Sequence, residues 1–395
     1  MSDKIVEARL ERAVAAMNEF DIDLWVTYGR ETHFTSEPVL NYLIPCDVLF
    51  PIAIVVTKAG QSICIVESLN ADELITHGSF TQVVNYSDYN AFDETLLNVI
   101  KEHMINPSCK VALNTSVSDS SADGLSHTGW LRLTRLFEEA GFKGEYVSSY
   151  MIMKRMRAQK SQAEIDKIAA AVEKGVQILD EARSHIKVGL NGPEIQAFFQ
   201  KKSAELAAPS LYSPFCSIGP RSSYLCKRPA VDVYVQPGDV VNVDYGVIVD
   251  GFASDNQRTY YILKEGETEA PEYVRNAVKC LQEANKAAAA IMKPGVYTTD
   301  LRDAANAVIR SYGFPEVPSL GHELGIFAHE GGMRAGSDFR APELDNHIEE
   351  GMVFTFEPAI LLDIGRVCQE EVVVCTKDGG KFLSRFQDGP WLIKG

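Results

Sequence analysis

Residues 240–263 constrain this chain more than any other stretch. They read VVNVDYGVIVDGFASDNQRTYYIL, with an apolar run on each side of Asp250-Gly251. That dipeptide suits a two-residue hairpin turn, because both positions tolerate positive φ. A turn there pairs the strands so that Asp244 lies opposite Gln257. Asp255, two residues before Gln257, then points to the same face as Asp244.

The two aspartates of this hairpin become diagonal neighbours, with β-carbons roughly 7 Å apart or less. Carboxylates held that close repel each other unless a cation lies between them, and a divalent metal ion meets that need. The alternative is that Asp244 and Asp255 are both solvated on an exposed strand face. This stretch alone leaves both interpretations open.

The length and charge of the chain bound its class. With 395 residues it is long enough for two domains that each have a core. The net charge of −16 argues against nucleic acid and anionic membranes as partners, since both select clustered Lys and Arg. No apolar run approaches the ~20 residues of a membrane span. We therefore expect a protein without nucleic-acid or membrane partners.

Two features predict a cytoplasmic location. The N-terminal segment MSDKIVEARLERAVAAMNEF is charged and amphipathic and lacks the apolar core of a signal peptide. The eight cysteines are scattered, without the closely spaced pairs of a zinc ribbon, which is typical of a protein from a reducing compartment.

Hydrophobic periodicity predicts two domains, residues 1–155 and 156–395. The first reads as a small α/β domain in which helices pack on a sheet. Its predicted helices are 4–20, 92–105 and 130–140, and its predicted strands are 24–28, 48–56, 62–66, 110–114 and 144–147.

The second domain begins after a basic segment, MIMKRMRAQK, at a capping box formed by Ser161 and Glu164. It mixes long helices with antiparallel strands, an α+β pattern rather than a doubly wound one. Beside the hairpin, its predicted helices are 162–185, 269–292 and 298–312, with another after Asn191-Gly192-Pro193-Glu194, and its predicted strands lie in 351–362 and 369–376.

Further candidate metal ligands lie in this second domain. His322 and His329 occur in SLGHELGIFAHEGG, where the glycines permit tight turns that aim a side chain inward. Glu357 follows the apolar strand VFTF, and Glu370 and Glu371 open the last predicted strand, EEVVVCT. Taken alone, each is a weak signal, because a lone histidine is more often a hydrogen-bonded polar residue than a metal ligand and a glutamate beside a strand is usually solvated.

The order and spacing of these residues resemble the family of methionine aminopeptidases, Xaa-Pro aminopeptidases and prolidases, metallopeptidase family M24. Its pattern is Asp, ten residues, Asp, then Gly-His-x-x-Gly, then Glu-Pro, then a Glu that opens a late strand. The resemblance covers residues 155–385. It implies the pita-bread fold for the second domain and a first domain like that of the creatinase and prolidase branch, in which Lys-Ser-x-x-Glu also occurs.

The resemblance assigns a role to each candidate. Asp244, Asp255, His322, Glu357 and Glu370 would bind two metal ions, with Glu370 preferred over Glu371 because the family's Arg-Ile-Glu-Asp aligns with CQEE. Glu357 would also shuttle a proton. His329 would contact the substrate carbonyl or its oxyanion; Glu357 and His329 are thus the predicted catalytic residues.

The chemistry of this ligand set agrees with a metal site. Four carboxylates and one imidazole suit Mn²⁺, Co²⁺, Fe²⁺ or Zn²⁺ rather than a thiolate-selecting site. Two such ions about 3.5–4 Å apart share a hydroxide, lower its pKa and polarise the scissile amide. The resemblance therefore predicts a hydrolase that acts on Xaa-Pro dipeptides or on the N-terminal Xaa-Pro bond of short peptides.

Two positions depart from the family pattern. The peptidases usually carry a histidine before the first Asp, and here Cys226 stands in its place, with Arg228 close by. Cys226 either fills space or helps to shape a substrate pocket. In addition GRVCQEE replaces GxRIED, so that the expected arginine is displaced upstream to Arg366, which alters the surroundings of Glu370.

These departures leave three functions open. The first is the Xaa-Pro peptidase. The second keeps the fold but acts on a small non-peptide substrate, as creatinase, ectoine hydrolase and dimethylsulfoniopropionate lyase do. The third is a non-catalytic binding module, which the full ligand set disfavours. The resemblance also implies a homodimer in which the first domain closes over the partner's active site, and His33 would then reach that pocket.

Overall fold

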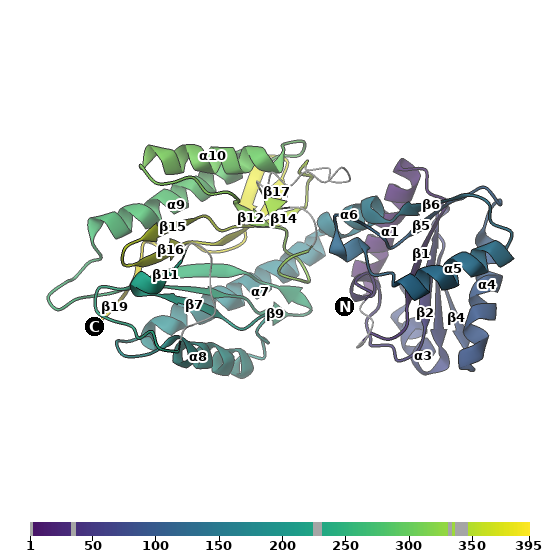
Figure 1. The fold of residues 1–395 in the computed structure, drawn as a ribbon, viewed down its shortest axis with the longest axis horizontal. Helices are drawn as coiled ribbons and strands as arrows, with labels where there is room; N and C mark the ends of the chain where they lie inside the picture. The colour runs from purple at the N-terminus through teal and green to yellow at the C-terminus, as the bar shows by residue number, and fades with distance from the viewer. Residues whose placement is uncertain (1–2, 33–36, 224–230, 331–333, 336–346) are drawn as a thin grey trace. The chain divides into compact units, whose positions relative to one another are not determined.

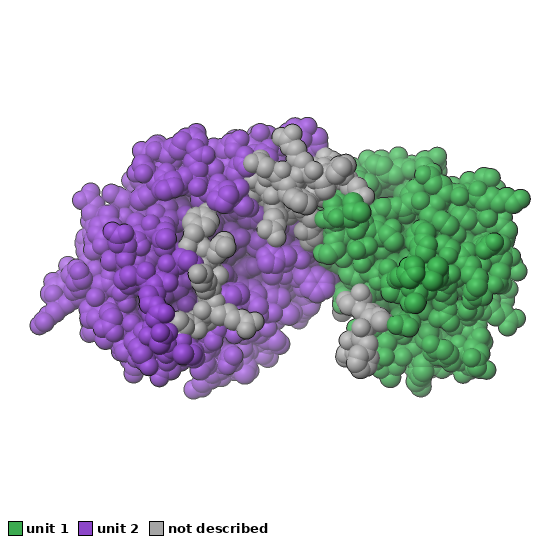
Figure 2. Space-filling view, viewed as in Figure 1, with its two compact units in different colours: residues 1–161 green, residues 162–395 purple. Residues whose placement is uncertain are grey.

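The computed structural model describes residues 3–32, 37–223, 231–330, 334–335 and 347–395 (Figure 1). The chain divides into two compact units, Met1–Ser161 and Gln162–Gly395 (Figure 2). The division lies between Ser161 and Gln162, whereas the sequence led us to expect it after residue 155. That residue lies within helix α6 (Tyr150–Ala158), which belongs to the first unit.

The first unit is a six-stranded sheet with helices packed on it. The strand order is β4-β3-β2-β1-β5-β6, with β1–β2 and β2–β3 antiparallel and the other pairs parallel. Its elements are α1 (Asp3–Glu19), β1 (Leu24–Gly29), α2 (Leu40–Leu43), β2 (Ile52–Thr57), β3 (Ser62–Glu67), α3 (Ser68–His77), β4 (Gln82–Tyr86), α4 (Phe92–His103), β5 (Lys110–Leu113), α5 (His127–Glu139), β6 (Glu145–Ser148) and α6.

Several elements of this unit differ from the sequence prediction. The strand predicted at 48–56 begins only at Ile52, because the amide of Val48 donates to the Thr32 hydroxyl in a loop and Pro51 has no amide hydrogen to offer. Helices α2, α3 and α6 and strand β4 were not predicted. β4 is an edge strand with partly exposed side chains, so its apolar alternation is weak.

The second unit is built on the predicted hairpin. β8 (Val240–Tyr245) pairs antiparallel with β11 (Asn256–Ile262), and Asp244 lies opposite Gln257, which confirms the predicted register. Asp250 and Gly251 form the turn with φ values of 51° and 80°. The tip of the hairpin separates into the short strands β9 (Ile248–Val249) and β10 (Phe252–Ala253).

Helices lie on both sides of the strands in the second unit: Figure 1 shows α9 and α10 on one side and α7 and α8 on the other. They are α7 (Gln162–Glu181), α8 (Gly192–Glu205), α9 (Glu272–Ile291) and α10 (Thr298–Ser311). The predicted start of α8 is confirmed by a capping box, in which Asn191 accepts from the amide of Glu194 and Glu194 accepts from that of Asn191. This mixture of helices and antiparallel strands is the predicted α+β class.

Short strands from the C-terminal part complete the unit. They are β12 (Gly321–His322), β13 (Arg334–Ala335), β14 (Val353–Phe356), β15 (Ala359–Leu362), β16 (Gly365–Cys368), β17 (Glu371–Thr376), β18 (Gly379–Phe382) and β19 (Trp391–Ile393), while β7 (Phe215–Ile218) flanks β8. The strand predicted in 351–362 is interrupted at Glu357-Pro358, which brings the Glu357 side chain to a strand end. In the described part of the chain, no helix has the length and apolarity to cross a membrane.

Candidate metal centre

His322 is held at the edge of the site by a close approach of two strands. A β-carbon on Gly321 would lie 1.9 Å from the backbone oxygen of Thr355, so only glycine fits where β12 meets β14. The Nδ1 atom of His322 lies 3.1 Å from the backbone oxygen of Glu323. Since a carbonyl only accepts, Nδ1 is the donor in this contact, which makes Nε2 the nitrogen that is available to bind a metal.

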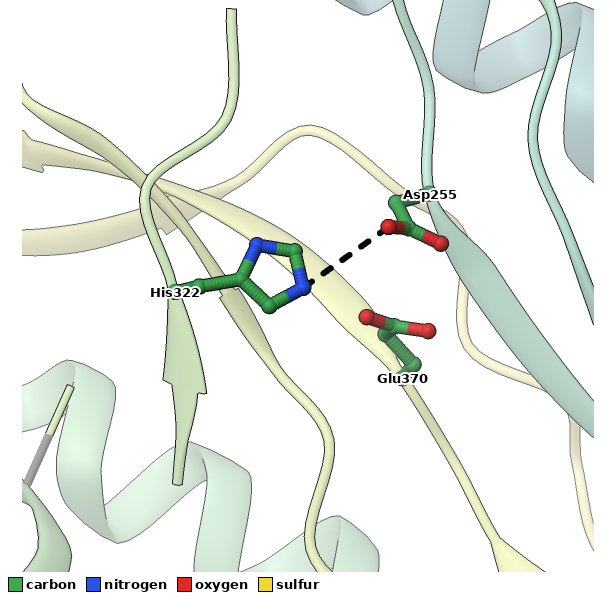
Figure 3. A group of neighbouring side chains, drawn as sticks. All are labelled: Asp255, His322 and Glu370. Carbon is green, nitrogen blue, oxygen red and sulfur yellow. Dashed lines mark ion pairs between the residues drawn. The ribbon is translucent and has the colours of Figure 1, made fainter. Parts of the chain in front are cut away.

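Three buried side chains from distant parts of the chain converge at this place. Asp255 comes from the residue before β11, His322 from β12, and Glu370 from the residue before β17 (Figure 3). One ligand atom from each lies within 4.8 Å of those of the other two. The Nε2 atom of His322 is 3.7 Å from Oδ2 of Asp255.

The surroundings of Glu370 show whether the cluster of Asp255, His322 and Glu370 suits a cation. The residue is 1 % exposed, and neither of its carboxylate oxygens has a hydrogen-bond partner within the described ranges. Burial, followed by the negative charges of Asp255, Glu357 and Asp244, raises its pKa well above the usual range. A buried carboxylate without donors is costly, and a cation bound by its oxygens removes that cost. The residues therefore fit a metal ion.

Glu357 presents its two oxygens to different partners. Its Oε1 lies 3.5 Å from Nε2 of His322, and its Oε2 accepts a hydrogen bond of 3.0 Å from Nε2 of Gln257. The backbone amide of Glu357 donates to the backbone oxygen of Leu320, which ties the end of β14 to the residue before β12. Oε1 thus faces the site while Oε2 faces the protein.

Asp244 and Asp255 meet at a residue that the sequence did not reveal. The hydroxyl of Tyr212 lies 2.5 Å from an oxygen of each aspartate. Burial raises the pKa of Tyr212 well above its usual range, and the charges of Asp244 and Asp255 add to the effect. Burial and the neighbouring Asp244 likewise raise the pKa of Asp255. The stretch SLYSPF around Tyr212 has no pattern that marks such a role.

The two adjacent glutamates, Glu370 and Glu371, have different partners. Glu371 is fully buried and accepts from Nη2 of Arg258 at 3.1 Å, from Nε2 of Gln369 at 2.8 Å and from the hydroxyl of Ser384. Arg258 also donates to the backbone oxygen of Glu370 at 2.9 Å, which holds the backbone of Glu370 in place. Glu371 thus belongs to a buried ion pair, and Glu370 is the one that faces His322.

His329 lies beside His322, with ring centroids 4.2 Å apart and the rings edge to face. Its side chain is exposed, unlike that of His322. The loop between them is folded around Glu330, which is buried and accepts from the amide of Ile326. A β-carbon on Gly325 would lie 2.3 Å from the Glu330 carboxylate, so the second glycine of GHELG leaves room for this acceptor.

The remaining predicted pocket residues, His33, Cys226 and Arg228, lie outside the described residues. The five predicted ligands are therefore found as follows. Asp255, His322 and Glu370 form one cluster, Glu357 adjoins it through His322, and Asp244 adjoins it through Tyr212.

Comparison with known proteins gives this geometry a context. The profile of the family described as "Metallopeptidase family M24" matches residues 166–377. The chain is 27% identical over 302 residues to the Xaa-Pro dipeptidase of Pyrococcus furiosus, covering 75% of this chain and 81% of that one. It is 29% identical over 267 residues to the Xaa-Pro dipeptidase of Lactobacillus helveticus, covering 66% and 68% of the two chains.

Solved structures agree on the fold. The X-Pro aminopeptidase of Thermotoga maritima superposes with a TM-score of 0.76 at 23% identity, over 96% of this chain and 100% of that one. The prolidase of Pyrococcus furiosus superposes with a TM-score of 0.71 at 23% identity, over 95% and 99%. These likenesses confirm the predicted pita-bread fold and its smaller N-terminal domain.

Proposed function

The chain belongs to metallopeptidase family M24, and from that membership we propose that it hydrolyses Xaa-Pro dipeptides or the N-terminal Xaa-Pro bond of short peptides in a metal-dependent reaction. One observation carries the metal dependence. Glu370 is buried, has no hydrogen-bond donor within the described ranges for either carboxylate oxygen, and lies beside Asp255 and His322. The substrate class is taken from the relatives, whose names are those of Xaa-Pro dipeptidases.

We assign two divalent ions to five ligands: Asp244, Asp255, His322, Glu357 and Glu370. Oxygen-rich sets with one imidazole accept Mn²⁺, Co²⁺, Fe²⁺ or Zn²⁺, and Mn²⁺ is our first choice because its preference for carboxylates matches four of the five ligands. When bound, such ions lower the pKa of a water molecule and polarise the scissile carbonyl.

Three side chains have further proposed roles in the reaction. His322 donates from Nδ1 to the Glu323 backbone, so that Nε2 is the nitrogen that would bind the metal. Glu357 holds Oε2 on Gln257 and presents Oε1 to the site, and we assign Oε1 to take a proton from the attacking water and to return it to the leaving amide nitrogen. His329 is exposed at the edge of the cluster and is suited to donate to the substrate carbonyl oxygen as negative charge develops.

A small non-peptide substrate is the second candidate, because Cys226 stands where the peptidases usually carry a histidine. The relatives named above are all peptidases, which favours the first candidate.

We further propose a cytoplasmic homodimer. The location is supported by the cysteines, since the seven in the described ranges are all free thiols and six of them are buried. The homodimer rests on the resemblance to the prolidase and creatinase branch. Light scattering of the purified protein tests it, and the mass of a monomer at micromolar concentration would contradict it.

The test of the function begins with chelated protein that is reloaded with Mn²⁺, Co²⁺, Fe²⁺ or Zn²⁺. Metal content is measured by elemental analysis, and mass spectrometry follows cleavage of Gly-Pro, Ala-Pro and Xaa-Pro-Xaa tripeptides, with creatine, ectoine and dimethylsulfoniopropionate in parallel. We expect Xaa-Pro cleavage that depends on metal and is lost in Glu357→Gln. Glu350→Gln is the matched control. It removes an exposed carboxylate that pairs with Lys377, and the variant should remain fully active.

Two outcomes would overturn the proposal. Protein that retains no metal after loading contradicts the assigned ligands. Metal-loaded protein that cleaves none of the Xaa-Pro peptides contradicts the substrate, and turnover of one of the small molecules would then establish the second candidate.

A further inference from the structure

A chain of buried polar side chains leads away from Glu357 into the protein. Its members are Gln257 on β11, Arg366 on β16 and Asn242 on β8, with side chains from three strands. Gln257 is 1 % exposed, Arg366 4 % and Asn242 0 %. Polar groups are costly to bury unless each donor and acceptor is used, so the hydrogen bonds of this chain reveal how it is oriented.

Hydrogen bonds fix the orientation of the two side-chain amides in this series, those of Asn242 and Gln257. Nδ2 of Asn242 donates to the backbone oxygens of Arg258 at 3.1 Å and of Cys368 at 3.4 Å. Backbone oxygens only accept, so Oδ1 of Asn242 points the other way, where it accepts from Nη1 of Arg366. The same Nη1 donates to Oε1 of Gln257 at 2.5 Å.

Arg366 thereby determines which end of Gln257 meets Glu357. A guanidinium has only donors, so the amide oxygen of Gln257 must face it. The amide nitrogen then faces Oε2 of Glu357, to which it donates at 3.0 Å. If the amide were reversed, its oxygen would face a carboxylate and its nitrogen a cation, and both contacts would be repulsive. The positive charge also polarises the amide and strengthens the bond to Glu357.

The torsion that this bond restrains is a soft one. Rotation of a glutamate carboxylate about its last bond is broad, so the side chain's own preferences do not fix the plane of the Glu357 carboxylate. The bond from Gln257 does so, because it keeps Oε2 on the protein side and Oε1 3.5 Å from Nε2 of His322. Neither Gln257 nor Arg366 is among the proposed metal ligands.

We propose that Gln257 is a positioning residue for Glu357, and that Arg366 acts through it by fixing the orientation of the amide. This inference rests on the proposed function for its effect on turnover. Its effect on metal binding is independent of which substrate the enzyme takes. Loss of an outer partner of a metal ligand typically lowers metal affinity or activity by about 10–100-fold.

The first test replaces Gln257 by methionine, which fills a similar volume without polar atoms. We expect a Mn²⁺ dissociation constant raised about 10-fold in calorimetric titration, and a kcat on an Xaa-Pro dipeptide reduced about 10–100-fold with KM changed much less. Gln387→Met is the matched control. Gln387 is also buried, and its amide exchanges hydrogen bonds of 3.0 and 2.9 Å with the backbone of Thr259 on the same strand. The control should lower the melting temperature but leave kcat and Mn²⁺ binding unchanged.

The second test is a double-mutant cycle with Arg366→Met. If Arg366 acts through Gln257, the double variant has nearly the kcat of Gln257→Met alone, whereas independent structural effects would multiply. Arg366→Lys keeps a donor for Oε1 of Gln257 and should restore part of the activity that Arg366→Met loses. If Arg366→Met does not fold, Gln257→Met and its control decide the question.

The outcomes separate this inference from the proposed function. If the wild-type protein cleaves no Xaa-Pro peptide but Gln257→Met still weakens Mn²⁺ binding relative to Gln387→Met, the substrate proposal is wrong and the positioning role stands. If the wild-type protein is active and Gln257→Met matches Gln387→Met in both kcat and Mn²⁺ affinity, Gln257 has no positioning role.

Discussion

Replacing Gly321 by alanine tests how the fold holds His322. The added β-carbon would lie 1.9 Å from the backbone oxygen of Thr355, whereas real β-carbon contacts essentially never fall below 3.0 Å. A backbone oxygen cannot turn aside as the end of a flexible side chain can. The contact therefore requires β12 and β14 to separate by about 1 Å, and His322, the next residue on β12, must move with Gly321.

The size of the effect follows from this displacement. A shift of about 1 Å in a catalytic group can lower the rate by about 100-fold. The same overpacking costs roughly 1–3 kcal/mol of stability, which corresponds to a few degrees in melting temperature for a unit of this size. We therefore expect a folded variant whose kcat/KM falls about 100-fold and whose Mn²⁺ content after loading is reduced, since Nε2 of His322 no longer lies beside Asp255 and Glu357.

The assay is kcat/KM on an Xaa-Pro dipeptide, with elemental analysis and thermal unfolding on the same samples. Gly313→Ala is the control, because Gly313 has a φ of 80° and no atom within 4 Å of its added β-carbon. It should lose stability through backbone strain but keep its activity. A Gly321→Ala protein that folds and retains both full activity and full metal content would refute the claim that this close approach positions His322.

Three further predictions concern buried charges. Glu370→Gln removes a carboxylate from the candidate metal centre, so metal content after Mn²⁺ loading should fall by about half or more in elemental analysis, while the melting temperature of chelated protein should rise because the variant no longer buries a carboxyl group whose pKa burial raises. Burial, with Asp123 nearby, raises the pKa of Glu37 from 4.5 to about 8 in the folded protein. The unfolded chain therefore loses this proton at lower pH than the folded protein does. The free energy of unfolding should fall by roughly 4–5 kcal/mol as the pH rises between those two values. Urea unfolding of Glu37→Gln, followed by tryptophan fluorescence, should show a flatter pH dependence; an unchanged slope would contradict it. Arg258→Met leaves Glu371 buried without its cation and should cost roughly 3–5 kcal/mol in thermal unfolding, more than an exposed arginine variant such as Arg275→Met.

The parts of the site that the sequence predicted are those that local rules govern. The turn at Asp250-Gly251 fixes the hairpin register, and the register alone places Asp244 opposite Gln257 with Asp255 on the same face. Because side chains alternate along a strand, the neighbours Glu370 and Glu371 point in opposite directions. Glu371 contacts Arg258 and Glu370 faces His322, in agreement with the choice of Glu370.

The parts that the sequence did not reveal depend on contacts between distant elements. Tyr212 lies in an irregular segment before β7, and only the packing of that segment brings its hydroxyl to Asp244 and Asp255. The role of the Gln257 amide cannot be predicted from the sequence, because it depends on a contact with Glu357 at the end of β14. These two residues are 100 positions apart in the chain. Periodicity contains no information about such pairs.

Arg366 lies two residues before Cys368, the position that the resemblance assigns to the family's arginine. Arg366 and Cys368 are two residues apart on β16, so they share a face but lie roughly 6–7 Å apart along the strand. The Cys368 thiol contacts the backbone oxygen of Glu357 at 3.5 Å, whereas the Arg366 guanidinium reaches Asn242 and Gln257 instead. From β16, Arg366 meets Glu357 by way of a side chain that accepts at one end and donates at the other. A glutamine at position 257 supplies both, and neither an apolar residue nor a carboxylate there would do so.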